Sequence, residues 1–223
     1  MLFRSECHLG DHRDLHSFPT RRSSDLPVSA DLEGGFGDAP EDCAETIRQG
    51  AAAGLVGGSI EDSTGRKDDP IYAHDLAVER VRAAVATARS LPFPFTLTAR
   101  SENFLWGRPD LADTIKRLQA FQDAGADVLY APGLKTREEI TTLIRAIDRP
   151  VNVLAGIPGA LSVAELSEMG VKRISVGGAL ARAAFGAFMT AAKEMRTAGT
   201  FTFTDAAMPM RELNAIFAGW KKS

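Results

Sequence analysis

A repeating alternation of short apolar runs and Ala-rich amphipathic stretches, which begins at Pro27, constrains the fold of this chain more than any other sequence feature. Strands that alternate with helices in this way indicate βαβ units and therefore a parallel sheet. The runs predict strands over Val28–Asp31, Leu55–Ile60, Phe95–Ala99, Val128–Tyr130, Val151–Leu154 and Arg173–Val176. The stretches that follow them predict helices over Glu41–Ala53, Ala73–Ser90, Ala112–Ala124, Arg137–Ile147, Val163–Met169 and Leu180–Ala198.

Local start and stop signals support several of these helices. Pro40 suits a first helical turn, while Thr136 and Ser162 are placed to cap helices that carry Glu138 and Glu165 near their starts. Glycine is common just after a helix because it adopts the left-handed backbone conformation without strain. Three predicted helices are followed by glycine, at Gly54, Gly125 and Gly170.

Charged residues at the predicted strand ends decide between two α/β architectures. A doubly wound sheet would carry a glycine-rich phosphate-binding turn after its first strand, but here that strand ends in Asp31 and Glu33. Further charges follow the next two strands, at Glu61 and Arg100. A TIM barrel collects its active-site residues from many strand ends in this way. We therefore predict an α/β fold of the (β/α)8 TIM-barrel type, incomplete, with about six of its eight βα units present.

Residues 1–26 differ from the rest of the chain, because they show neither a helical nor a strand period. The stretch HSFPTRRSSDL, residues 16–26, resembles a translated short-read sequencing adapter. We interpret residues 1–26 as a non-native segment, with a natural disordered tail as the alternative. Residues 27–223 are then a partial TIM-barrel catalytic domain, whose C-terminal helical extension is predicted over Asp205–Phe217.

Charge and cysteine content exclude several classes of function. The net charge of −3 provides no electrostatic reason to expect nucleic acid or an anionic membrane as a partner. No apolar run approaches the ~18 residues of a membrane span. The two cysteines, Cys7 and Cys43, form neither a disulfide framework nor a zinc-binding pattern. These features are typical of a cytoplasmic protein.

The end of the first predicted strand carries a candidate metal site. Residues two apart on a strand face the same side, so Asp31 and Glu33 are expected to point together into the barrel mouth. Two adjacent carboxylates repel each other unless a cation or a proton lies between them, and such oxygen ligands suit Mg²⁺. Gly34 and Gly35 would let the backbone approach a ligand closely. The alternative is a strand end followed by an ordinary glycine turn.

The next two strand ends add to this site. Glu61 could complete an acidic cluster, although an acidic pair at a helix start is a common alternative. Arg100 could anchor a carboxylate or a phosphonate through two parallel hydrogen bonds. The alternative for Arg100 is a structural ion pair with one of the carboxylates.

The order and spacing of these motifs resemble the isocitrate lyase/phosphoenolpyruvate mutase superfamily, including its phosphonomutase-like and 2-methylisocitrate lyase-like members. The resemblance covers the chain from Pro27 to Phe217. It rests on an ordered set: Asp31 with Gly35-Phe36-Gly37, Ile60-Glu61-Asp62, Ala99-Arg100, Ala126-Asp127, Ala131-Pro132-Gly133-Leu134, Val151-Asn152-Val153 and Arg173-Ile174-Ser175.

The resemblance implies a Mg²⁺-dependent enzyme that cleaves or rearranges a C–C or C–P bond of a small 2-oxo or hydroxy acid through an enolate. Asp31 would be the direct metal ligand, while Glu33 and Glu61 would act partly through water. Glu61 and Arg100 are the catalytic candidates implied. The substrate, an oxo acid or a phosphonate, would be bound by Gly34, Gly35, Arg100 and Asn152.

Departures from the superfamily pattern narrow the function. Its thiol-dependent lyases carry a Lys-Lys-Cys-Gly-His or Lys-Arg-Cys-Gly-His loop after the Glu-Asp pair, whereas the loop Ser63–Tyr72 has no cysteine. Cys43 lies on the preceding helix, where a small buried residue is expected. We therefore expect a lyase or hydrolase without a catalytic cysteine. Two alternatives remain: a phosphoenolpyruvate/phosphonopyruvate mutase, and a catalytically dead fragment or oxo-acid-binding scaffold.

The superfamily also implies an assembly. Its members tend toward homo-oligomers, so we expect a tetramer or a dimer in which the C-terminal helix Leu180–Ala198 is exchanged with a partner.

Overall fold

A computed structural model describes residues 26–219 of the chain, in two compact units that divide between Ser175 and Val176. Apart from Leu26, the segment interpreted as non-native lies outside the described residues. None of the helices within residues 26–219 is both long enough and apolar enough to cross a membrane.

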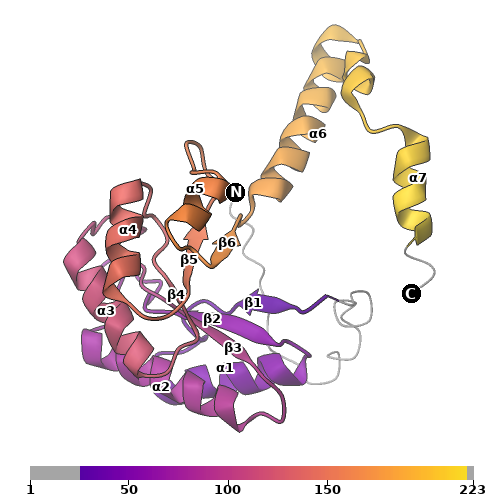
Figure 1. Ribbon diagram of the computed structural model, residues 1–223. Helices are drawn as coiled ribbons and strands as arrows, with labels where there is room; N and C mark the ends of the chain where they lie inside the picture. The colour runs from indigo at the N-terminus through magenta and orange to yellow at the C-terminus, as the bar shows by residue number, and fades with distance from the viewer. Residues whose placement is uncertain (1–25, 220–223) are drawn as a thin grey trace. The chain divides into compact units, whose positions relative to one another are not determined.

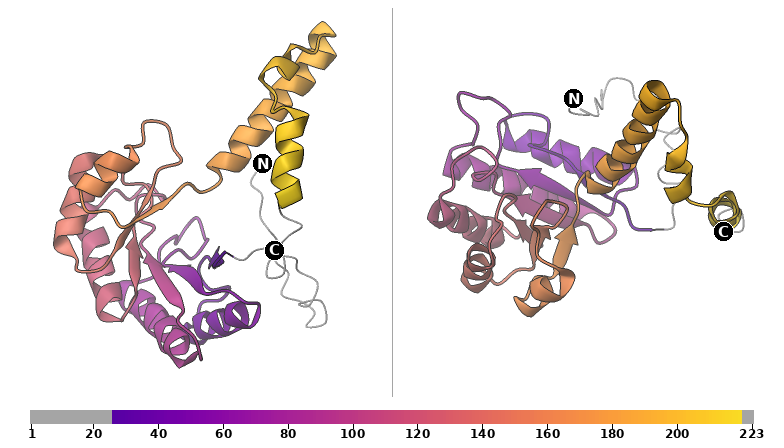
Figure 2. Two further views of the ribbon diagram at one scale, coloured as in Figure 1. Left: turned by 45° about the vertical axis from the view of Figure 1, so that its right-hand side comes forward. Right: turned by 90° about the horizontal axis from the view of Figure 1, so that it is seen from above.

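The first unit is a curled parallel sheet whose outer face is covered by helices (Figures 1 and 2). Its strand order, β1-β2-β3-β4-β5-β6, follows the sequence, and every neighbouring pair is parallel. The predicted incomplete TIM-barrel type is therefore confirmed. The strands are β1 Ser29–Asp31, β2 Gly57–Glu61, β3 Thr96–Arg100, β4 Val128–Tyr130, β5 Val151–Leu154 and β6 Arg173–Ser175. The helices are α1 Pro40–Ala52, α2 His74–Ser90, α3 Leu111–Asp123, α4 Arg137–Ala146 and α5 Val163–Glu168.

The predicted caps explain where these helices begin and end. The hydroxyls of Thr136 and Ser162 accept the backbone N–H of the third helical residue, at 3.1 Å and 3.3 Å respectively. Such capping satisfies N–H groups that have no partner within the helix. The three predicted terminal glycines all have a positive φ: 99° at Gly54, 101° at Gly125 and 94° at Gly170.

The two faces of the sheet have opposite character. Toward the helices, alternate strand residues such as Ile60, Leu97 and Leu129 are buried in one apolar core. The other face is polar, because the residues between them carry charged or hydrogen-bonding side chains. We call this set the polar row; across the strands it comprises Asp31, Ser59, Glu61, Thr98, Arg100, Tyr130, Asn152, Arg173 and Ser175.

The second unit contains helix α6 (Ala179–Ala198), the 3₁₀ segment η1 (Thr202–Ala206) and helix α7 (Met210–Gly219). The extension helix predicted over Asp205–Phe217 is present as α7, but its predicted start is wrong, because the chain is interrupted at Pro209 and α7 begins at Met210. Proline has no backbone N–H to continue a helix, and it disfavours helical geometry in the residue before it. The carbonyl of Pro209 instead accepts the first hydrogen bonds of α7, from Glu212 and Leu213.

Candidate active site at the strand ends

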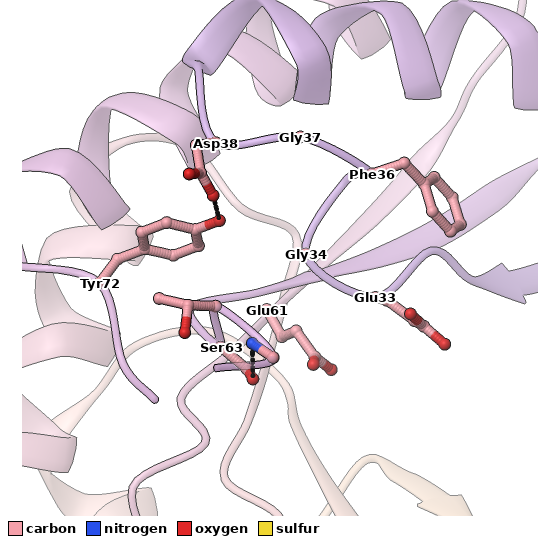
Figure 3. A pocket seen from close by; sticks show the side chains of 10 residues that line it. Glu33, Gly34, Phe36, Gly37, Asp38, Glu61, Ser63 and Tyr72 are labelled. Atoms are coloured by element: carbon pink, nitrogen blue, oxygen red, sulfur yellow. Dashed lines mark hydrogen bonds between the residues drawn. The ribbon is translucent and has the colours of Figure 1, made fainter. Parts of the chain in front are cut away.

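The loop after β1 and the loop after β2 enclose a cavity of about 270 Å³ (Figure 3). We call residues 33–39 the glycine loop and residues 63–71 the lid loop. Asp38 and Tyr72 lie at one end of the cavity, and the carboxylates of Glu33 and Glu61 lie toward the other (Figure 3). The lining residues are Glu33, Gly34, Phe36, Gly37, Asp38, Glu61, Ser63, Thr64, Gly65 and Tyr72.

Asp31 adjoins this cavity at the end of β1. Its Oδ1 accepts hydrogen bonds from the Ser59 hydroxyl at 3.1 Å and from the Glu33 backbone N–H at 3.2 Å. Its Oδ2 lies 2.6 Å from Nη1 of Arg100, which extends from β3 across the end of β2. The predicted meeting of the first three strand ends is therefore observed, and it is centred on Arg100.

Three carboxylates surround Arg100. Besides Asp31, its Nη2 lies 3.0 Å from Oε2 of Glu61 and 2.9 Å from Oε1 of Glu102. The same Glu102 oxygen accepts a hydrogen bond from Nε at 2.9 Å. The guanidinium also lies over the ring of Tyr130, with 5.3 Å between Cζ and the ring centre. The structural ion pair considered as an alternative for Arg100 is present, and it involves several carboxylates.

Crowding of buried charges shifts the pKa values of this cluster. Burial, and then the negative charge of Glu102, raises the pKa of Glu61 to about 8. Burial likewise raises the pKa of Glu102 to about 7, against the lowering effect of Arg100. Burial would lower the pKa of Arg100, but the carboxylates of Glu102, Glu61 and Asp31 raise it above its usual value. A further cation near Glu61 would relieve this crowding.

The donor set suits Mg²⁺, which binds carboxylate oxygens and retains several waters. Asp31, Glu33 and Glu61 are placed at one edge of the sheet, around or beside the cavity. Within residues 26–219, however, no three acidic, histidine or cysteine side chains are grouped as they would be around a metal ion. The Arg100 guanidinium contacts both Asp31 and Glu61, and so it places a positive charge beside these two carboxylates.

Glu33 reaches the cavity for a different reason than predicted. The strand ends at Asp31, so the alternation of side chains along a strand does not fix the direction of Glu33. Its backbone adopts the left-handed conformation instead, with a φ of 48°. Phe36, in the same loop, has a φ of 59°. Positive φ at two residues other than glycine marks a strained loop, which its surroundings must hold in place.

The two glycines predicted to bind substrate have different roles in the structure. Gly34 lines the cavity, and a Cβ there would lie 2.8 Å from the Ser63 carbonyl oxygen. Gly35 faces Cys43 of α1, because a Cβ built on it would lie 2.7 Å from Sγ. Cys43 is fully buried, as expected, and burial raises the pKa of its thiol to about 11.

Gly35→Ala is expected to lower the free energy of unfolding by about 2–4 kcal/mol, which combines left-handed strain with overpacking against Cys43. Gly65→Ala is the matched control, because Gly65 also has a positive φ (72°) but nothing lies within 4 Å of its Cβ position. The control should lose only about 1–2 kcal/mol. Urea denaturation of both variants measures the difference, and equal losses would contradict close packing at Gly35.

The lid loop is joined to the glycine loop by groups that the sequence did not single out. Tyr72 donates a hydrogen bond from its hydroxyl to Asp38 Oδ1 at 2.6 Å, and Nη1 of Arg66 lies 3.0 Å from both oxygens of the same carboxylate. Trp106 donates from Nε1 to the Ser63 hydroxyl at 3.0 Å, at the base of the lid loop. The bonds of Tyr72 and Arg66 to Asp38 hold the lid loop against the glycine loop, while the Trp106 bond joins the base of the lid loop to the segment after β3.

Arg80 of α2 supports the glycine loop from behind. It is 1% exposed, and its guanidinium stacks on the ring of Tyr72, 4.1 Å from the ring centre. Its Nη atoms donate hydrogen bonds to the backbone carbonyls of Gly34, Gly37, Asp38 and Ala39. No pattern in the sequence distinguishes this arginine from the exposed ones on the same helix.

Asn152 belongs to the polar row but not to the cavity lining. It lies on β5 between Tyr130 and Arg173, is 2% exposed, and donates from Nδ2 to the Ser175 hydroxyl at 3.0 Å. Its Oδ1 is buried and has no hydrogen-bond partner among the described residues. Substrate binding by Asn152 therefore remains a prediction.

Comparison with known proteins gives consistent results. The family model described as phosphoenolpyruvate phosphomutase matches residues 18–196. A solved structure described as a lyase or mutase from Burkholderia cenocepacia J2315 is 66% identical, with a TM-score of 0.84, and the match covers 86% of this chain and 70% of that chain.

More distant matches are with proteins that are named for particular reactions. An oxaloacetate decarboxylase of Paraburkholderia xenovorans (strain LB400) is 34% identical over 163 residues, which are 70% of this chain and 52% of that protein. A phosphonopyruvate hydrolase solved with oxalate and Mg²⁺ is 25% identical, with a TM-score of 0.75, and the match covers 90% of this chain and 71% of that chain. The chain spans about half the length of the curated relatives it matches.

Proposed function

Because this chain belongs to the phosphoenolpyruvate phosphomutase family of the isocitrate lyase superfamily, we propose that it acts in Mg²⁺-dependent cleavage of a C–C or C–P bond in a small 2-oxo acid. The observation that carries this proposal is the meeting of Asp31, Glu61 and Arg100 at three neighbouring strand ends beside a cavity. Such a site at the C-terminal edge of a barrel sheet is where TIM-barrel enzymes bind their substrates.

Each residue has a distinct proposed role. Asp31 would hold the metal directly, while Glu33 and Glu61 would hold its waters. When bound, Mg²⁺ would supply Lewis-acid stabilisation of the negative charge that develops on the oxo-acid oxygen. Arg100 would orient a carboxylate or phosphonate group of the substrate through paired hydrogen bonds. The relatives that act on oxaloacetate and phosphonopyruvate support this substrate class.

A mechanism without a catalytic thiol is part of the proposal. Among the described residues Cys43 is the only cysteine, and it lies behind the glycine loop with its Sγ 3.7 Å from the Gly34 carbonyl oxygen. Cys43→Ala is therefore expected to retain turnover within about twofold per folded molecule, since a buried thiol of raised pKa makes a poor acid or base at neutral pH. Steady-state pyruvate assays measure this, and a loss above about 100-fold would contradict the proposal.

A substrate panel tests the reaction itself. The protein is incubated with Mg²⁺ and oxaloacetate, phosphonopyruvate or 2-methylisocitrate, and pyruvate release is followed. Release from at least one substrate supports the proposal, whereas binding without turnover of any substrate supports a scaffold. The name of the matching family favours the alternative of a mutase. Phosphorus NMR of the phosphonopyruvate reaction distinguishes hydrolysis from this alternative. Hydrolysis yields phosphate, and the mutase yields phosphoenolpyruvate.

We also propose that the chain forms a homodimer or tetramer through α6. This helix has no buried residue and exposes Leu180, Phe188 and Met189. Exposed apolar side chains in this number mark an interaction surface. Light scattering coupled to gel filtration is expected to show an oligomer, and Phe188→Glu should shift it toward the monomer. A monomeric wild type would contradict the proposal.

A further inference from the structure

We propose that Arg100 is a built-in counter-cation for the metal-binding carboxylates, and that Glu102 is the positioning residue that keeps Arg100 in place when Mg²⁺ displaces it from Asp31 and Glu61. This inference rests on the proposed metal site. It adds that metal binding is coupled to Arg100, the residue proposed to bind the substrate.

The donors of Arg100 divide into two groups. Among residues 26–219 its Nη1 contacts only Asp31, and its Nη2 contacts Glu61 as well as Glu102. Its Nε is bonded only to Glu102 among the described residues. The Nη1 and Nη2 edge is one of the two guanidinium edges that can bind a carboxylate bidentately, and it contacts both Asp31 and Glu61, which are assigned to the metal.

The three carboxylates differ in exposure, which determines how easily each can release Arg100, and the Glu61 side chain, which is 15% exposed, lies between the other two. The side chain of Asp31 is 61% exposed, so solvent can compensate for the loss of its ion pair. The side chain of Glu102 is only 4% exposed, so its separation from Arg100 would leave a buried charge without a partner. Glu102 is therefore the carboxylate expected to retain Arg100 when the others bind a metal.

The backbone of Glu102 is also fixed. Its N–H donates to Oδ1 of buried Asp62 at 2.8 Å, and Asp62 is in turn bonded to Nη1 of Arg117 at 3.3 Å. Arg117 also donates to the carbonyl of Tyr72 at 3.0 Å, next to the lid loop. This buried chain of contacts anchors Glu102, so Arg100 can turn about a fixed partner.

Metal and substrate binding are coupled as a consequence. Without Mg²⁺, Arg100 contacts Asp31 and Glu61, and these contacts block its Nη1 and Nη2 edge. With Mg²⁺ on those carboxylates, the same edge is free for a substrate carboxylate or phosphonate, while Nε remains on Glu102. Because Mg²⁺ binding frees Arg100 for the substrate, each of the two ligands raises the affinity of the protein for the other by the same factor.

Mg²⁺ titration by calorimetry, on two variants of the full chain, tests this exchange. In Glu102→Gln, Arg100 loses its retaining partner and pairs more strongly with Asp31 and Glu61, so Mg²⁺ affinity should fall about tenfold. In the double variant Arg100→Met/Glu102→Gln, the competing cation is gone and the net charge equals that of the wild type. Its Mg²⁺ affinity should exceed that of Glu102→Gln by at least about tenfold.

The recovery of Mg²⁺ affinity in the double variant distinguishes this proposal from a purely structural role, which would weaken binding in both variants. Arg89→Met is the matched control, because Arg89 pairs with Asp127 away from the described cavity, and its Mg²⁺ affinity should match the wild type within about twofold. A double variant that binds Mg²⁺ no more tightly than Glu102→Gln overturns the inference alone. A wild type that binds no Mg²⁺ overturns the proposed metal site and this inference with it.

A measurement on the unmodified chain covers the case in which a variant does not fold. The side-chain Nε–H signal of Arg100 in ¹⁵N-labelled protein, identified by its loss in Arg100→Lys, should stay protected from solvent exchange before and after Mg²⁺ addition. Loss of that protection on Mg²⁺ addition would show that Glu102 does not retain the guanidinium, and would overturn the proposal.

Discussion

Replacing Asp31 with alanine is expected to abolish Mg²⁺-dependent pyruvate release and to lower Mg²⁺ affinity by more than about 100-fold. Loss of a residue that only supports a metal ligand already lowers metal affinity or activity by about 10- to 100-fold, and Asp31 is proposed as a direct ligand. Glu33 and Glu61 line the cavity and are proposed to hold the metal through water, so neither is expected to replace Asp31 as a direct ligand. Calorimetry with Mg²⁺ and the pyruvate assay measure the two effects.

The Asp31 variant should still fold. Asp31 is the exposed partner of a pair whose Arg100 side chain is buried, but Arg100 keeps Glu61 and Glu102, so the free energy of unfolding should fall by only about 1–3 kcal/mol. Glu79→Ala is the matched control, since it removes another carboxylate from an exposed ion pair, with Arg82 on α2. The control should keep full activity. Wild-type Mg²⁺ affinity in Asp31→Ala would refute the metal assignment.

Replacing Arg80 with methionine is expected to lower the free energy of unfolding by about 3 kcal/mol or more. The guanidinium is buried and bonded to four backbone carbonyls of the glycine loop, which would lose their donor without gaining water. The loop also holds positive φ values at Glu33 and Phe36, a strain that the remaining contacts would have to maintain alone.

Arg82 on the same helix provides the control for this prediction. It is exposed and pairs only with Glu79 among the described residues, so Arg82→Met should change stability by less than about 1 kcal/mol. Urea denaturation of both variants measures the contrast. A loss below about 1 kcal/mol in Arg80→Met would mean that the glycine loop keeps its shape without this clamp.

The secondary structure could be predicted because its signals are local. The predicted strands and the first six helices agree with the structure to within about two residues, since apolar period, caps and terminal glycines act over a few positions. The approach of Asp31, Glu61 and Arg100 was also predictable, because the ends of neighbouring parallel strands meet at one edge. Pro209 is the local signal that the prediction of the last helix overlooked.

The rest of the site depends on contacts that sequence periodicity does not encode. The clamp by Arg80 and the bonds from Tyr72 and Arg66 to Asp38 form only once the glycine loop has its left-handed turns. Glu102 lies two residues after Arg100, but its role depends on its burial, which the sequence does not show. The sequence does not show that Arg100 pairs with both Asp31 and Glu61, because this pairing depends on side-chain positions in the folded chain.

The sequential strand order has an energetic consequence. In the described sheet each strand pairs only with the strands that directly precede and follow it in the chain, so the sheet resembles a linear array with nearest-neighbour coupling. Strand β1, which has only three residues and one neighbour, is then a weakly coupled edge of that array. A ligand that bridges Asp31 and Glu61 would add a second link between β1 and β2. Occupancy of the site would therefore slow amide hydrogen exchange first at this edge, far more than in the central strands.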